Sequence, residues 1–189
     1  MQISKKGIRA LGVAESFAGR EKAVICGVSM RKDLRIDGAG FGYTTIGGND
    51  ATDSVINLVS GFKRDDINVI LIGGCVISWF NVLSLSRIFS ETGIPVICVT
   101  YEESDGLAGH ISHHFPGDNE RLARYQDLGQ RIPWKIKTGY TLFFRAQGLS
   151  DTDAGHICED FTHDGKIPEP VKIARLIARG FMQCTMNSK

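Results

Sequence analysis

Two carboxylates stand at points of the sequence where a metal site would need them. Glu15 follows an apolar run, residues 8–13, that predicts a buried strand, and α/β sheets present functional groups at such strand ends. Asp50 opens a segment with helical periodicity. Together they could bind Mg²⁺, which activates water and stabilises a leaving oxygen. Asp50 also suits a helix N-cap, with Asp53 at the third helical position, and both interpretations stay open.

Histidines and cysteines give weaker patterns. His110 and His114 have a zinc spacing if they lie on a helix, but no HExxH glutamate accompanies them and Pro116 follows, so we expect a loop there. The five cysteines form no CxxC pair, and Cys158 beside His156 is interpreted as part of a helix rather than a nucleophile. GxxxxGK[ST], GxGxxG and GxSxG motifs are absent, so nucleotide hydrolysis, dinucleotide binding and serine-hydrolase chemistry lose their usual support.

A basic stripe runs along the last predicted helix, residues 171–182. Lys172, Arg175 and Arg179 occur at i, i+3 and i+7, beside an apolar stripe that would face the core. Cations at this spacing favour contact with the phosphates of a nucleic acid, and a merely solvated helix face is the alternative.

The composition indicates one ordinary globular domain over residues 1–189. The chain has a net charge of +1 and 42% hydrophobic residues, which excludes a disordered chain. Residues 37–120 hold eleven acidic and three basic side chains, between two basic ends. The apolar stretch 69–80 is too short to span a bilayer, and the first ten residues contain no apolar leader segment. We therefore expect a cytoplasmic protein without a membrane partner.

The order of predicted elements indicates an α/β fold. Strands are expected at 8–13, 23–30 and 36–46, then a helix from 49 to 62, a strand at 68–72, a helix from 75 to about 90 and a strand at 94–99. Later elements are a helix at 119–127, a strand at 141–145, a helix at 151–161 that Ser150 caps, and the last helix. An antiparallel meander continued by parallel βα units predicts a mixed, ribonuclease-H-like sheet flanked by helices.

Four segments resemble one archaeal family. GVAESF at 12–17, GGNDAT at 47–52, LIGG with WFN within 71–81, and IPEPVKIARLIARG at 167–180 are similar to the endonuclease dU family, itself similar to endonuclease V. The resemblance implies a ribonuclease-H-like fold and Mg²⁺- or Mn²⁺-dependent cleavage of DNA near deaminated bases, those containing uracil or hypoxanthine. It also implies a role in DNA repair.

Three acidic residues of the family pattern are replaced in this chain. Ala14 stands in the first strand, Gly47 before the first helix and Gly73 after the central strand, and only Glu15 and Asp50 match. Two carboxylates with waters make a weak metal site.

Two hypotheses follow from the resemblance and from the three positions at which this chain lacks the acidic residues of the family pattern. One is a Mg²⁺-dependent endonuclease in which Glu15 and Asp50 hold the metal. The other is a catalytically degenerate member that keeps the fold and binds nucleic acid or a protein. Phe41, Tyr43 and Trp79 are candidates for an aromatic side chain that probes a duplex.

Overall fold

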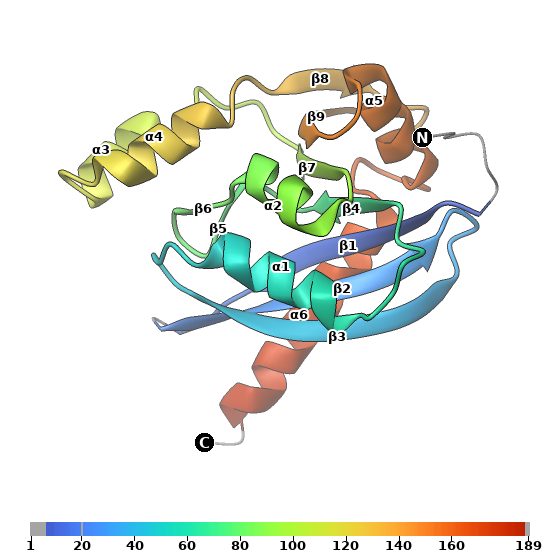
Figure 1. The fold of residues 1–189 in the computed structure, drawn as a ribbon, viewed down its shortest axis with the longest axis horizontal. Coiled ribbons are helices and arrows are strands. Elements are labelled where there is room, and N and C mark those ends of the chain that lie inside the picture. The colour runs from blue at the N-terminus through green and yellow to red at the C-terminus, as the bar shows by residue number, and fades with distance from the viewer. Residues whose placement is uncertain (1–6, 20, 188–189) are drawn as a thin grey trace.

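Seven strands form one mixed sheet in the computed structural model, which describes residues 7–19 and 21–187 (Figure 1). Residues 1–6, part of the stretch from which we expect no leader, lie outside the described residues. The strands are, in spatial order, β3 (Ile36–Thr45), β2 (Lys22–Arg31), β1 (Arg9–Ser16), β4 (Val69–Ile72), β7 (Val96–Thr100), β9 (Thr141–Gln147) and β8 (Ile132–Lys135). β1, β4 and β7 run parallel, and the other neighbours pair antiparallel.

Helices cover both faces of the sheet. One face packs against α1 (Ala51–Gly61) and α2 (Leu85–Thr92), and the other against α5 (Asp151–Asp160) and α6 (Glu169–Asn187), as Figure 1 shows. α3 (Ala108–His114) and α4 (Asn119–Asp127) pack together beside the sheet. β1 and β4 are buried on both sides because each contributes alternate residues to the two apolar clusters. The predicted ribonuclease-H-like fold is confirmed.

Three local predictions are wrong. Residues 75–84 are not helical: β5 (Val76–Ile77) and β6 (Asn81–Val82) form a small hairpin before α2 begins. The segment around His110 is the helix α3 rather than a loop, anchored by the buried side chain of Ile111. Strand β8 was not predicted, since it is short and contains Pro133 at the edge of the sheet.

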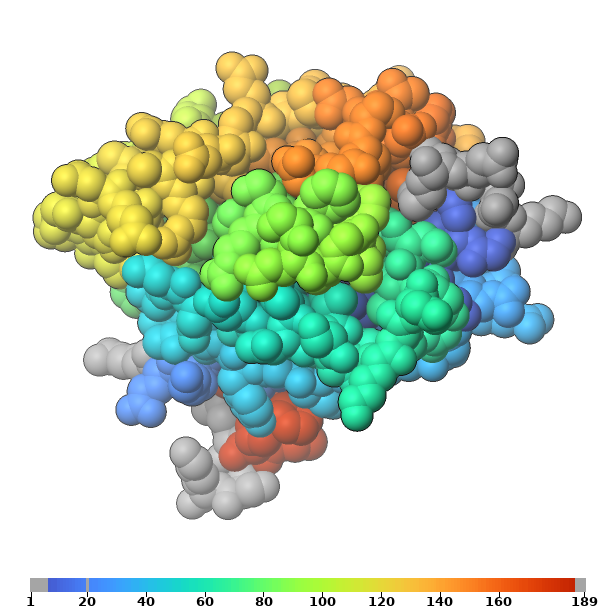
Figure 2. All heavy atoms as spheres, in the orientation of Figure 1, coloured from blue at the N-terminus to red at the C-terminus, as the bar shows by residue number. Residues whose placement is uncertain are grey.

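The start of α6 lies directly against β1. A β-carbon built at Gly12 would come within 2.2 Å of the Pro170 carbonyl carbon, so only glycine allows this approach. Pro170 occupies the first turn of α6, where its missing N–H costs no hydrogen bond. The far end of α6 extends past β3, and Figure 2 shows it emerging below the sheet. α6 therefore spans from the centre of the sheet to beyond its edge.

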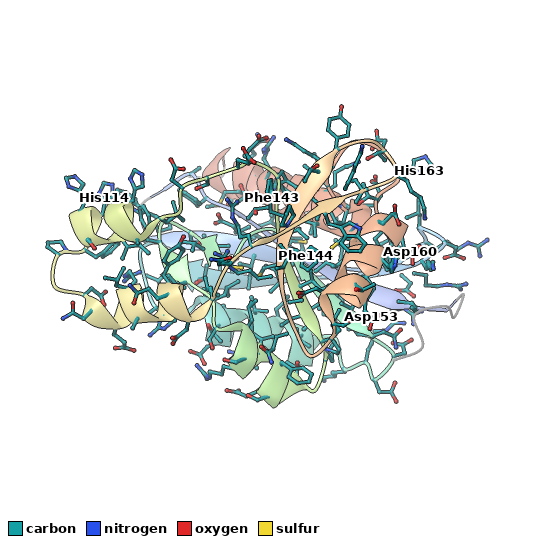
Figure 3. The ribbon with its side chains drawn as sticks, turned by 90° about the horizontal axis from the view of Figure 1, so that it is seen from above. His114, Phe143, Phe144, Asp153, Asp160 and His163 are labelled. Carbon is teal, nitrogen blue, oxygen red and sulfur yellow. The ribbon has the colours of Figure 1, made fainter. Side chains whose placement is uncertain are left out.

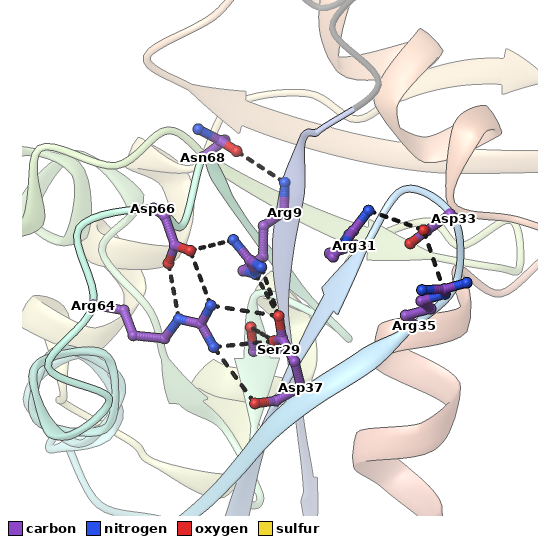
Figure 4. A network of polar contacts seen from close by, with 9 residues as sticks. All are labelled: Arg9, Ser29, Arg31, Asp33, Arg35, Asp37, Arg64, Asp66 and Asn68. Carbon is purple, nitrogen blue, oxygen red and sulfur yellow. Dashed lines mark hydrogen bonds and ion pairs between the residues drawn. The ribbon is translucent and has the colours of Figure 1, made fainter.

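Alternating charges tie the amino-terminal end of β1 to its neighbours (Figure 4). Arg9 binds the carboxylates of Asp37 and Asp66, and Arg64 binds the same two carboxylates. The Ser29 hydroxyl adds a 2.8 Å hydrogen bond to Asp37. This network lies at the opposite end of β1 from Glu15, so we assign it a structural role. Within residues 7–19 and 21–187, no helix is long and apolar enough to cross a membrane.

Candidate functional site

The carboxyl ends of β1 and β4 lie side by side at one edge of the sheet. Val13 of β1 pairs with Ile72 of β4, and the Gly73 N–H donates to the Val13 carbonyl at 2.9 Å. Open α/β sheets bind ligands outside the carboxyl ends of their parallel strands. This edge holds Glu15 and Gly73 and is therefore the place to look for a site.

The predicted site residues at this edge point to two different faces of the sheet. Ala14 is buried in the apolar cluster on the α6 side, so Glu15, the next residue, points to the α1 side. A β-carbon at Gly73 would lie on the α6 side, 3.0 Å from Val171 and 3.4 Å from the Nη2 atom of Arg175. Positions 14 and 73 thus lie on the same face of the sheet. The charged side chain that α6 places there is Arg175.

The turn between β5 and β6 has an unusual backbone. Three consecutive residues are in the left-handed region, with φ of 44° at Ser78, 55° at Trp79 and 59° at Phe80. Each such non-glycine residue costs about 1–2 kcal/mol. The turn persists because its carbonyl groups are held: the Gly47 N–H donates to Ser78 at 2.7 Å, and the Arg121 guanidinium donates to Phe80.

Glu15 is held by this strained turn. Its Oε2 atom accepts a 2.7 Å hydrogen bond from the Ser78 hydroxyl, and the side chain is half-buried. The bond joins β1 to the turn across 63 residues. Glu15 is thus fixed in place on the α1 side of the sheet.

Asp50 is surrounded by hydrogen-bond donors. Its Oδ1 atom accepts from the Thr44 hydroxyl at 2.8 Å, the Thr45 N–H at 3.0 Å and the Asn81 amide at 2.8 Å, and Oδ2 accepts from the Thr45 hydroxyl at 2.8 Å. Partial burial opposes ionisation, but these hydrogen bonds outweigh it and lower the pKa of Asp50 to about 2. The protein itself therefore satisfies both oxygens of this carboxylate.

Asp50 occupies the predicted N-cap position of α1, with Asp53 in the first turn, but its side chain does not act as the cap. It makes no capping hydrogen bond to α1. The Ala51 N–H at the helix start donates instead to the Oδ1 atom of Asn81 at 3.0 Å. Asp53 forms an ion pair with Arg87 at 2.5 Å, so it is engaged on the helix surface. Asn81 thus binds Asp50 and caps the helix that follows it.

One segment connects Glu15 and Asp50: Ser78 contacts the first and Asn81 the second. Among the residues that the structure describes, no group of three or more His, Cys, Asp or Glu side chains is arranged to hold a metal. The exposed histidines of α3 do not join such a group. Figure 3 shows His114 at one end of the molecule and Asp160 and His163 toward the other.

The three residues of the predicted basic stripe on α6 lie in different environments. Lys172 is neutralised by Asp164 at 2.5 Å and Glu169 at 2.7 Å. Arg175 is half-buried and points to Gly73, whereas Arg179 is exposed. Of these three residues, Arg175 and Arg179 form no ion pair with any residue that the structure describes.

A cavity of about 540 Å³ opens beside Gly73 and is lined by residues from both faces of the sheet. It lies beyond the carboxyl ends of β4 and β7, and its wall includes four cationic side chains: Arg131, Arg145, Lys166 and Arg175. Glu102 is the acidic residue of the lining. The edge of the sheet that was expected to gather carboxylates gathers positive charge instead.

Comparison with known proteins shows to which family this chain is related. A family model described as "Endonuclease dU" matches residues 6–182. The UPF0215 protein of Thermococcus kodakarensis is 34% identical over 189 residues, which cover 94% of this chain and 94% of that protein. The chain belongs to the endonuclease dU family.

Two solved structures share the fold of this chain. A protein of unknown function from Archaeoglobus fulgidus superposes with a TM-score of 0.79 at 28% identity, covering 93% of this chain and 98% of that one. Endonuclease V of Ciona intestinalis, in complex with a DNA containing an inosine followed by a ribo-adenosine, gives a TM-score of 0.60 at 16% identity, with coverage of 97% and 88%. The similarity to the Ciona intestinalis structure shows that this member of the endonuclease dU family has the endonuclease V fold.

Two of the positions where the resemblance implies acidic residues have defined surroundings in this member of the endonuclease dU family. Gly47 has a φ of 67°, which disfavours any residue with a side chain, and its carbonyl accepts a 3.0 Å hydrogen bond from Arg121. Gly73 faces Arg175. A carboxylate placed at position 47 would therefore strain the backbone, and one placed at position 73 would meet a guanidinium.

Sequence reasoning missed several residues at this edge. Ser78 and Asn81 lie in a segment that was expected to be helical, and the WFN motif was the one signal that marked it. Arg131, Arg145 and Lys166 lie in three separate segments with no common spacing, so no sequence pattern links them.

Proposed function

We propose that this chain binds nucleic acid, DNA in the first instance, as a member of the endonuclease dU family that no longer cleaves it. One observation carries the proposal: on the face of the sheet that holds Ala14 and Gly73, the Nη2 atom of Arg175 lies 3.4 Å from the position of a β-carbon at Gly73. A fixed cation attracts phosphate and opposes a divalent cation.

The residues present do not fit the Mg²⁺ or Mn²⁺ that the resemblance implies. Donors of the protein occupy both oxygens of Asp50. Glu15 is on the opposite face from positions 14 and 73, and its carboxylate is bound by Ser78. A metal ion would have to displace these donors to bind Asp50, and the remaining carboxylate, Glu15, is bound at one oxygen by Ser78, so we assign no catalytic step to a metal ion at this edge.

The choice of DNA rests on the family and on fold relatives. The endonuclease V of Ciona intestinalis is seen in complex with an inosine-containing DNA. In this chain Arg175 and the exposed Arg179 are one helical turn apart on α6, so both can contact phosphates of one nucleic acid. We expect the protein to bind nucleic acid in the cytoplasm.

One structural observation favours the alternative hypothesis that the protein cleaves DNA. Glu15 and Asp50 contact the same segment, residues 78–81, so a rearrangement of that segment would expose both carboxylates together. In that case Glu15 and Asp50 would be the catalytic and metal-binding residues, and substrates would be deaminated DNA.

Binding is tested by fluorescence anisotropy with short labelled DNA, single-stranded and duplex, carrying a deoxyuridine, a deoxyinosine or neither, in the presence of EDTA. We expect binding that weakens steeply between about 50 and 200 mM salt, because phosphate contacts release counterions. Arg175→Gln and Arg179→Gln should each reduce both the affinity and the salt dependence. Arg35→Gln, at the opposite end of the sheet, is the matched control and should behave as the parent. Absence of binding by the parent would overturn the proposal.

Cleavage is tested on the same DNA with Mg²⁺ or Mn²⁺, beside an active relative and a Glu15→Ala variant. We expect intact DNA in every lane of this protein. Cleavage by a clean preparation that is lost in Glu15→Ala would establish the endonuclease alternative instead.

A further inference from the structure

The cavity beside Gly73 has the size and position of a small-ligand site. Its volume of about 540 Å³ falls within the range of about 300–1,000 Å³ that is common for such sites. Its lining comes from the ends of β4 and β7, the loop that follows β7, strand β9 and helix α6. A space of this size holds one nucleotide rather than a continuous strand.

Four cations converge on this cavity from separate parts of the chain. Arg131 precedes β8, Arg145 lies on β9, Lys166 precedes α6 and Arg175 lies on α6. Glu102 offsets one of them, since it pairs with Lys166 at 2.5 Å, but its own side chain is 82% exposed. The cavity therefore carries an excess of positive charge and favours an anion.

Three of these cations are oriented by the protein. Arg131 donates to the carbonyl groups of Glu102 at 2.8 Å and Ser104 at 2.9 Å, which fixes the loop after β7. Arg145 donates through Nε to the Gly129 carbonyl at 2.8 Å. Lys166 donates to the Tyr101 carbonyl at 2.9 Å. These contacts build the wall and leave part of the donor capacity of each side chain unused.

Arg175 and Tyr101 are the two groups that lack a polar partner. The Arg175 guanidinium lies 5.7 Å from the centre of the Tyr101 ring, and the structure gives it no hydrogen bond to any described residue. The Tyr101 hydroxyl is buried and is the one side-chain polar atom of the described residues that is buried without a hydrogen-bond partner. Burial raises the pKa of Tyr101, so the hydroxyl remains a donor at neutral pH. Because the Tyr101 hydroxyl is buried against the apolar core, Arg175 is the unpartnered donor that a ligand in the cavity can reach.

We propose that this cavity binds the phosphate monoester of a nucleotide, with Arg175 as its donor and Arg131, Arg145 and Lys166 supplying the surrounding charge. A phosphate monoester carries a charge of about −1.5 to −2 and three free oxygens, which match a cavity with several cations and unused donors. The ester comes from either a free mononucleotide or the phosphorylated end of a strand. The strand-end form rests on the proposed function, whereas the mononucleotide form does not.

The test is isothermal titration calorimetry with inorganic phosphate, deoxyuridine, deoxyuridine 5′-monophosphate and short DNA strands that end in a 5′-phosphate or a 5′-hydroxyl. We expect the monophosphate to bind and the nucleoside not to bind. A phosphorylated strand that binds more tightly than both the mononucleotide and the hydroxyl-ended strand identifies the strand end as the source. Equal binding of nucleoside and nucleotide would overturn the inference.

Two variants separate the inference from loss of the fold. Arg175→Gln removes the unpartnered guanidinium at a half-buried position, so the variant should fold as well as the parent and bind the monophosphate at least about tenfold more weakly. Tyr101→Phe, which removes a hydroxyl that the cavity does not reach, should keep the affinity of the parent, as should Arg35→Gln. Parent-like affinity in Arg175→Gln would contradict the inference.

Failure of this inference is distinguishable from failure of the proposed function. If only the inference fails, hydroxyl-ended and phosphorylated strands bind equally and the mononucleotide does not bind. If only the proposed function fails, the mononucleotide binds while hydroxyl-ended DNA does not.

Discussion

The Oδ1 atom of Asp50 accepts a 2.8 Å hydrogen bond from the side-chain amide of Asn81, 31 residues further along the chain. The same Asn81 caps α1 through its Oδ1 atom at 3.0 Å. Together the two contacts fix the start of α1 and the end of β3 to the hairpin that follows β4. In this structure Asp50 acts as a structural acceptor.

The first prediction follows from that role. Asp50→Asn should destabilise the protein by about 2–4 kcal/mol, because the new NH₂ group must face the donors of Thr44, Thr45 or Asn81. Urea denaturation measures the change in the free energy of unfolding. The matched control is Asp53→Asn on the same helix, whose exposed ion pair with Arg87 is worth at most about 1 kcal/mol. Equal stability of the two variants would contradict the assigned role.

A second prediction concerns pH. The pKa of Asp50 is lowered from 3.8 to about 2, and the Arg64 guanidinium lowers the pKa of Asp66 to about 2 as well. Because both folded-state values are depressed, the stabilisation is complete above the unfolded value of 3.8 and is lost as pH falls through about 2. Urea denaturation from neutral to acidic pH should show this loss. Asp50→Asn should show a smaller dependence on pH below 3.8, since one of the titrating carboxylates is absent. An unchanged dependence would mean that other groups control acid stability.

The third prediction concerns Trp79 in the left-handed turn. Its side chain is 51% exposed and meets His114 edge to face at 5.8 Å. Trp79→Gly should preserve or raise stability by up to about 1 kcal/mol, since glycine adopts positive φ without strain. The same change should weaken binding of single-stranded DNA by about 1–3 kcal/mol if a base stacks on the indole.

A matched aromatic variant tests the position of that contact. Tyr43 on β3 is 56% exposed, and Tyr43→Ala should leave DNA binding unchanged. The third candidate, Phe41, already stacks on Phe181 with ring centres 4.6 Å apart, so its ring is engaged within the protein. Loss of binding in Tyr43→Ala but not in Trp79→Gly would place the contact on the sheet instead.

The fold was predictable where local patterns are strong. A strand was predicted at 68–72, and its apolar residues Val69–Ile72 form the central strand β4 with both faces covered. Ser150 caps α5 as predicted, with the Asp153 N–H donating to its hydroxyl at 3.1 Å. Such elements depend on near neighbours in the chain, which the sequence displays directly.

The site was less predictable, because distant contacts determine it. Residues 78–80 have apolar neighbours that suggest a helix, yet contacts from Glu15, Gly47 and Arg121 hold them in a left-handed turn. The direction of the Asp50 carboxylate is likewise set by Asn81, which no local spacing reveals. The metal-binding roles of Glu15 and Asp50 stay predictions that the cleavage experiment decides.

The last prediction concerns the contact that joins two of the segments by which the family is identified, GVAESF and IPEPVKIARLIARG. Gly12→Ala should destabilise the protein by about 3 kcal/mol or more, because the new β-carbon would lie 2.2 Å from the carbonyl carbon and 2.4 Å from the carbonyl oxygen of Pro170. Backbone atoms cannot yield as a flexible side chain would, so α6 has to move away from β1. Gly180→Ala on the same helix is the matched control: position 180 is exposed with no atom within 4 Å of the new carbon, and alanine should stabilise the helix by about 0.5–1 kcal/mol. Thermal and urea denaturation measure both changes. A Gly12→Ala variant as stable as the parent would show that α6 does not rest on β1 as closely as this structure has it, and the position of Arg175 beside Gly73 would then lose its support.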